Sequence, residues 1–181
     1  MTKLIFVALI SICAATLKAQ VTFVKGYIVN DKGDTLKGEV KINPKKEQDN
    51  HNKVFFKDDK GIQKNYKPNK VKAYGYENNH YITMDMGGED KYYKAIARGE
   101  ISLYKMIFEE IKMNESSFEA EYFLQKNGDK KMTDVKPNKF KKQLGEMISG
   151  AAGYVSDYED SKTLDEAKAA EIINKYNTRE K

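Results

Sequence analysis

The stretch YYKAIARGEISLYKMIFEEIKM, from Tyr92 to Met113, decides the fold. From Tyr93 to Leu103 every second residue is apolar or small, and most of the residues between them are polar. A period of two places one face of a β-strand on a core and the other face in water. Gly99 interrupts the run, and a glycine within a strand is typical of a bulge or bend. We therefore predict one long bent strand, or two strands that meet at Gly99, in the middle of an antiparallel sheet.

A helix beginning at Leu103 is the competing interpretation of the same stretch, because Leu103, Ile107 and Ile111 also recur every four residues. The Tyr, Phe and Ile content of the segment favours a strand instead. The unbroken alternation before Leu103 also favours a strand.

Strand–turn–strand patterns lie on both sides of this central stretch. Their arms span residues 23–30 and 35–42, 53–57 and 62–66, 71–77 and 80–84, and finally 118–125, which lies between a predicted turn at 114–117 and Asn127-Gly128. An Asn-Gly pair is a strong hairpin signature. Short strands with turns about every ten residues predict an antiparallel meander that forms a barrel or sandwich.

The hydrophobic period changes after Val135. Apolar residues recur at helical spacing from Phe140 to Ala151, after Pro137, and again from Ala169 to Tyr176. Thr163 and Glu166 have the spacing of a capping box before the second of these segments. We expect a mainly β (α+β) protein in which a β domain over residues 20–135 is covered by a helical segment over 136–181. The two apolar helix faces would alternatively form a surface for a partner.

Residues 1–19 have the pattern of a secretory signal peptide. Lys3 precedes the uncharged run from Leu4 to Leu17, and Ala19 offers a small residue for cleavage. This run is shorter than the ~20 residues that cross a bilayer, which argues against a permanent anchor. Cys13 lies inside the run and follows Ile12, so we do not expect lipid attachment there. We predict a periplasmic, outer-membrane-associated or extracellular protein with no transmembrane segment after cleavage.

The mature chain predicted in this way contains no cysteine, because Cys13 is the only one in the sequence. Disulfides, zinc–thiolate sites and cysteine nucleophiles are therefore not expected. Loss of Lys3 and Lys18 with the signal peptide leaves 30 basic against 27 acidic residues, a net charge of about +3. The lysines are dispersed rather than clustered, so we do not expect a specific nucleic-acid partner.

No residues are predicted to be catalytic or to bind a metal, and no cofactor is expected. His51 and His80 have no ligand spacing with each other or with a carboxylate cluster. Carboxylates occur as adjacent pairs at Asp58-Asp59, Glu89-Asp90 and Glu109-Glu110. Neighbouring strand residues point to opposite faces, so such a pair does not act as an acid and a base without help from elsewhere in the fold.

Tyrosines interleaved with lysines form the strongest binding pattern. Six tyrosines lie between Tyr66 and Tyr93. Tyrosines on one sheet face, flanked by lysines, are able to stack sugar rings or nucleobases. The candidate ligand-binding residues are Tyr74, Tyr76, Lys72 and Tyr81. The alternative is that tyrosine is simply a good strand residue.

Several short motifs resemble a family of exported proteins of unknown function common in Bacteroidota. They are Gly26-Tyr27-Ile28-Val29, Gly33 to Val40, Tyr66-Lys67-Pro68, Gly99 to Tyr104, and Ile173 to Asn177. The resemblance covers most of the mature chain and implies a periplasmic, surface or secreted protein, and it brings no catalytic residues with it. We therefore expect a non-enzymatic envelope module that binds a glycan or another envelope protein, or that has a structural role. The alternative is a hydrolase of envelope or extracellular polysaccharide whose carboxylates are assembled by the fold.

Overall fold

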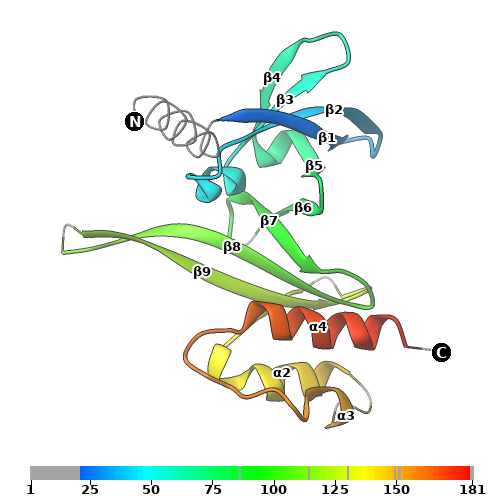
Figure 1. The fold of residues 1–181 in the computed structure, drawn as a ribbon, viewed down its shortest axis with the longest axis vertical. Helices are drawn as coiled ribbons and strands as arrows, with labels where there is room; N and C mark the ends of the chain where they lie inside the picture. The colour runs from blue at the N-terminus through cyan, green and yellow to red at the C-terminus, as the bar shows by residue number, and fades with distance from the viewer. Residues whose placement is uncertain are drawn as a thin grey trace, which may run out of the picture.

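The computed structural model describes residues 21–179 except Met86, Asn114, Lys130, Ser149 and Ala151. The predicted signal peptide, residues 1–19, and Cys13 lie outside the described residues. Ten strands form one antiparallel sheet in the order β10-β9-β8-β7-β6-β5-β1-β2-β3-β4 (Figure 1). They are β1 (Thr22–Asn30), β2 (Thr35–Ile42), β3 (Val54–Asp58), β4 (Gln63–Tyr66), β5 (Val71–Tyr76), β6 (Asn79–Asp85), β7 (Asp90–Ala97), β8 (Ile101–Lys112), β9 (Glu115–Lys126) and β10 (Thr133–Asp134).

The mainly β architecture is thus as predicted, but the sheet is not closed. It ends at β10 on one side and at β4 on the other, so of the two predicted forms the barrel is not supported, whereas a sandwich or an open sheet is compatible with the strand order. The order follows the chain except where β5 pairs with β1 rather than with β4. The chain crosses from β4 back to β5 through the short 3₁₀ helix η3 (Pro68–Lys70), which leaves β2, β3 and β4 as the outer part of the sheet.

The central stretch forms two strands, β7 and β8, which meet at the turn around Gly99, as one of the two predicted alternatives has it. Leu103 lies within β8, so the competing helix does not form. Tyr92, Tyr93, Ile101 and Leu103 are all buried. Ile101 and Leu103 pack against the C-terminal helices, whereas Tyr93 packs against its strand neighbours Tyr104 and Phe123.

The turn predicted at residues 114–117 is wrong in its position. Ser116 and Ser117 belong to β9 and pair with Ile111 and Glu110 of β8, and the turn lies at Met113. The long alternating partner strand offers a continuous ladder of hydrogen bonds, which outweighs the turn preference of serine. Asn127-Gly128 does form a turn, but the strand beyond it, β10, has only two residues.

Three helices follow the sheet: α2 (Phe140–Met147), α3 (Ala152–Val155) and α4 (Glu166–Asn177), and α2 is preceded by the 3₁₀ helix η4 (Pro137–Lys139). They cover one face of β7, β8 and β9 (Figure 1). The apolar faces predicted from helical spacing are buried there with Leu103 and Leu124. The N-cap of α4 is Asp165, whose side chain accepts from the Lys168 backbone N–H, rather than the predicted Thr163.

A second core lies in the amino-terminal half of the sheet. It contains Ile28, Val40 and Phe56 together with tyrosines of β5, β6 and β7. The 3₁₀ helix η2 (Glu47–His51) packs beside this core against β7 and β8. No helix among the described residues is long and apolar enough to cross a membrane.

Candidate functional site

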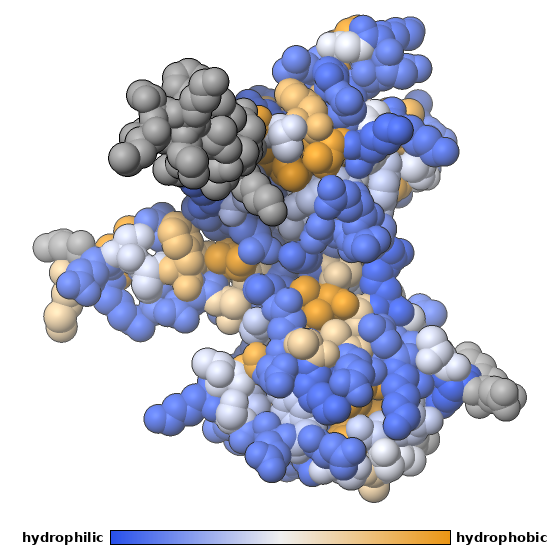
Figure 2. Space-filling model, viewed as in Figure 1, coloured by the Kyte–Doolittle hydropathy of each residue, from blue (hydrophilic) through white to orange (hydrophobic). Residues whose placement is uncertain are grey.

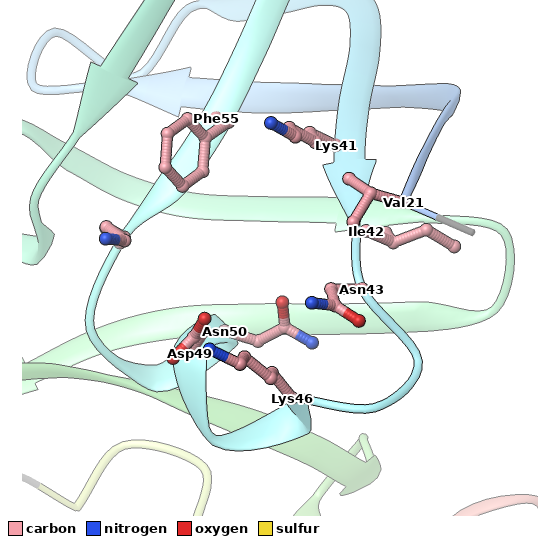
Figure 3. Close-up of a pocket in the computed structure, with 9 residues that line it drawn as sticks. Val21, Lys41, Ile42, Asn43, Lys46, Asp49, Asn50 and Phe55 are labelled. Carbon is pink, nitrogen blue, oxygen red and sulfur yellow. The ribbon is translucent and has the colours of Figure 1, made fainter. Parts of the chain in front are cut away.

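A lysine-lined pocket lies where β2 ends, η2 passes beneath it and β3 begins (Figure 3). Its volume is about 180 Å³. Since one water molecule occupies about 30 Å³ in the liquid, a pocket of this size holds a small group rather than a drug-sized molecule. The residues that line it are Val21, Lys41, Ile42, Asn43, Lys46, Asp49, Asn50, Lys53 and Phe55.

The charge in this lysine pocket is predominantly positive. Lys41, Lys46 and Lys53 line it against a single acid, Asp49. The ammonium groups of Lys41 and Lys53 lie 5.3 and 5.2 Å from the centre of the half-buried Phe55 ring. Cation–π contacts of this kind hold a lysine close to an aromatic face. The pocket therefore combines cations with an aromatic ring, a pairing suited to an anionic group on an apolar or sugar-like body.

A tight turn at Asn43-Pro44 brings these residues together. The Asn43 side-chain oxygen accepts from the Lys45 backbone N–H at 3.1 Å, and its backbone oxygen accepts from the Lys46 N–H at 3.0 Å. Asparagine closes such turns with its own side chain, and proline stabilises their backbone angle. The turn directs the chain into η2, which places Lys46 and Asn50 opposite the strand residue Lys41 (Figure 3).

The pocket rests on the buried tyrosines through one residue, Asn50. Its backbone oxygen accepts from the Tyr74 hydroxyl at 2.7 Å. Its side-chain amide donates to the hydroxyls of Tyr76 and Tyr81, each at 3.4 Å. Asn50 also lines the pocket, so the tyrosines fix the position of the pocket floor.

The predicted binding residues Tyr74, Tyr76 and Tyr81 do come together, but in the interior. Tyr74 and Tyr81 stack with their ring centres 4.5 Å apart, and all three are buried. Burial, followed by the neighbouring tyrosines, raises the pKa of Tyr74 well above its usual value. Lys72 is exposed at the start of β5. The expectation of an exposed tyrosine face is therefore wrong, because η2 covers these rings, and their part in binding stays a prediction.

The sequence did not predict that His51, a residue type common in functional sites, is buried. Its side chain is only 1% exposed, and its Nδ1 lies 2.7 Å from the backbone oxygen of Tyr92. A carbonyl only accepts, so Nδ1 carries the proton, and Nε2 has no hydrogen-bond partner among the described residues. Burial lowers the pKa of His51, more strongly than the hydrogen bond to Tyr92 raises it. A histidine in a polar stretch gives no periodic pattern from which this burial follows.

An ion pair anchors η2 to the sheet. Lys94 of β7 lies 3.0 Å from the Glu47 carboxylate. Burial raises the pKa of Glu47, but the hydrogen bond and charge of Lys94, with Lys105, outweigh this and leave the pKa below its usual value. The Glu47 carboxylate therefore stays ionised at neutral pH, and its ion pair with Lys94 holds the helix that forms the pocket floor.

At least one member of each carboxylate pair singled out in the sequence makes a local contact. Asp58 accepts from the backbone N–H groups of Lys60 and Ile62 at the β3–β4 turn. Glu89 pairs with Lys91, and Glu109 accepts from Ser116. Within the described parts of the chain, no three His, Cys, Asp or Glu side chains are placed to hold a metal ion.

Compared with known protein families, with curated proteins and with solved structures, the chain matches none of them.

Proposed function

We propose that this protein is an exported, non-enzymatic module that binds an acidic glycan through the lysine pocket. The observation that carries the proposal is that Lys41 and Lys53 lie over the Phe55 ring in a pocket that Lys46 also lines. Export is supported by the pattern of residues 1–19 and by the resemblance to exported proteins of Bacteroidota. After export, the pocket would be directly accessible to glycans of the cell envelope.

An acidic sugar fits the pocket better than a neutral one. Lysine ammonium groups attract carboxylate, sulfate or phosphate substituents, and the amides of Asn43 and Asn50 are suited to sugar hydroxyls. The volume of about 180 Å³ suits one terminal acidic sugar rather than a buried chain. The remainder of a polysaccharide would run across the surface.

Isothermal titration calorimetry with a uronic-acid or sulfated oligosaccharide tests the proposal. The variant Lys41→Ala/Lys46→Ala/Lys53→Ala removes the three cations. Three exposed ion pairs of about 0.5 kcal/mol each correspond to roughly a tenfold loss of affinity. The affinity of the unaltered protein should also fall as salt is raised, because these charges are screened.

The matched control is Lys32→Ala/Lys60→Ala/Lys70→Ala, which removes the same charge from exposed lysines outside the pocket. It should leave the affinity nearly unchanged. Equal losses for the two triple variants would reduce the binding to general electrostatic attraction. A neutral oligosaccharide that binds as tightly as the acidic one would refute the proposed ligand class.

The hydrolase alternative receives less support from the described residues. Paired catalytic carboxylates need a shared space between them for the scissile bond. In each acid pair of this chain at least one carboxylate is instead held by a local backbone, serine or lysine group. Absence of sugar release from acidic polysaccharide under conditions where binding is measured would separate the two functions.

A further inference from the structure

The hairpin of β8 and β9 extends beyond the strands on either side of it. β7 pairs with β8 only as far as Lys105, and β10 pairs with β9 only at Phe123 and Leu124. β8 and β9 continue to pair with each other as far as Lys112 and Glu115. Residues 106–121 therefore form a two-stranded ribbon, which we call the arm; its base lies beside η2 and its outer part projects from the body (Figure 1).

One face of the arm is apolar and exposed. The register places Ile107 opposite Ala120, and Glu109 and Ile111 opposite Phe118 and Ser116, all on the same face. Ile111 is 71% exposed, Phe118 53% and Met113, at the tip, 100%. Apolar surface is visible along the projecting hairpin in Figure 2. A two-stranded ribbon is marginally stable in water by itself, and exposed apolar surface of this kind marks an interaction site.

The arm is also strongly acidic. Five glutamates and one lysine give it a formal charge of −4; they are Glu109, Glu110, Glu115, Glu119, Glu121 and Lys112. The amino-terminal lobe, residues 21–72, has thirteen lysines against seven acids, a formal charge of +6. A partner for the arm therefore needs a basic surface, and the chain itself has one.

The exposed apolar residues are also divided between the arm and the lobe. Among the described residues, the large hydrophobic side chains that are exposed fall into two groups of three. Ile111, Met113 and Phe118 lie on the arm, and Val21, Leu36 and Ile62 lie on the lobe. Phe118, near the base of the arm, lies beside η2 of the same chain, whereas the outer part of the arm projects away from the body (Figure 1).

We propose that the arm docks on the amino-terminal lobe of a second copy of this chain, and that the second arm returns the contact. Such a two-fold dimer uses the same two surfaces on both chains. Each chain would contribute the sixteen residues of its arm and a comparable area of lobe. That agrees with the roughly 20–30 residues a side of a standard interface. Opposite charges bring the surfaces together, and the apolar groups exclude water between them.

Sedimentation velocity on the purified protein, at low and at high salt, tests the dimer. The unaltered protein should sediment with twice the mass of one chain, and 0.5 M salt should raise its dissociation constant several-fold. Ile111→Asn/Phe118→Asn should raise the dissociation constant at least tenfold. Glu115→Lys/Glu119→Lys should do the same by reversing arm charge.

The matched control for charge is Glu146→Lys/Glu171→Lys, which makes the same change on exposed glutamates of α2 and α4. It should leave the dimer intact. A protein that stays monomeric at about 100 µM overturns the proposal. So does a dimer that the arm variants leave unchanged while circular dichroism shows them folded.

Cross-linking keeps the proposal testable if the arm variants unfold. Ser117→Cys in a Cys13→Ser background gives a single thiol on an otherwise unaltered arm, and a photoreactive label attached to it reports what the arm touches. Cross-links to residues 21–72 of another copy support the proposal. Cross-links confined to the helices, to the arm of the other copy or to a different protein overturn it.

Discussion

The side-chain amide of Asn177, the last residue of α4, pairs with both backbone polar groups of Ile101, the first residue of β8. The Ile101 N–H donates to Asn177 Oδ1 at 2.9 Å, and Asn177 Nδ2 donates to the Ile101 oxygen at 2.8 Å. β7 pairs with β8 only from Leu103 onward, so Asn177 takes the place of a strand at Ile101. This contact ties the C-terminal helices to the turn at the centre of the sheet.

Replacement of Asn177 by alanine should destabilise the whole chain. It leaves the N–H and C=O of Ile101 without these partners, and an unsatisfied buried group costs about 1–3 kcal/mol. Urea denaturation measures the change in free energy of unfolding. Asn174→Ala, an exposed asparagine on the same helix, is the control and should change stability by less than about 0.5 kcal/mol. Equal effects of the two substitutions would contradict the bridging role.

Gly99→Ala should be destabilising for two physical reasons. Gly99 has a φ of +158°, and a Cβ there would lie 2.5 Å from Asn177 Cγ. We expect a loss of about 1–3 kcal/mol from the forced shift. Gly33→Ala is the comparison, because its φ is also positive, +95°, but it has open space around it. The excess for Gly99→Ala should shrink in an Asn177→Ala background, as a double-mutant cycle would measure.

Stability should fall in mild acid because of His51. Burial lowers the pKa of His51 in the folded state, so the unfolded chain binds more protons as the pH falls below about 6.5. Unfolding is favoured under those conditions, and the contribution is absent at pH 8. His51→Asn, which can still donate to the Tyr92 oxygen, should flatten the melting temperature between pH 7 and pH 5.

His80 provides the comparison for that experiment. Burial, and after it Arg98, lowers the pKa of His80, which is only partly buried beside Tyr27. His80→Asn should therefore retain most of the acid sensitivity of the unaltered protein. If instead the His51 variant keeps the full dependence of the melting temperature on pH, groups other than His51 account for that dependence.

Tyr74 should behave as a core residue in mutational tests. Tyr74→Ala removes a ring stacked on Tyr81 and should cost about 3–5 kcal/mol. Tyr74→Phe keeps the ring but loses the hydrogen bond to the Asn50 oxygen, with an expected loss of about 1 kcal/mol. Thermal unfolding measures both. A Tyr74→Phe variant with normal stability and abolished glycan binding would instead indicate direct contact with the ligand.

The local pattern predicted much of the fold because most strands have one dominant period. The apolar stripe from Ala169 to Tyr176 requires one buried face, and the structure buries it. The alternation from Tyr93 to Leu103 predicted strands, but not the irregularity between Ala95 and Ala97, which leaves Tyr93 and Leu103 in different cores. The open sheet edge did not follow from the sequence, because closure depends on which distant strands pair. The pairing of β1 with β5 is such a non-local choice.

The sequence predicted which residue types occur near the candidate site, but not how they are arranged. Tyrosines and lysines near β5 pointed to residues that lie beneath η2 and the lysine pocket, but alternation alone does not show which face another element covers. The covering element is η2, whose five residues are too short for a helical period and include two acids, an amide pair and His51. Its position depends on Lys94 and Tyr92, more than forty residues further along the chain.

The most direct test of glycan binding at the lysine pocket is a titration of isotope-labelled protein with an acidic oligosaccharide, followed by ¹H–¹⁵N NMR. We expect shifts to concentrate in residues 41–55, above all at Lys41, Lys46, Asn50 and Lys53, and to saturate together. Shifts spread evenly over the surface lysines, or concentrated at the shallow depression around Lys25, Lys37 and Lys57, would contradict it.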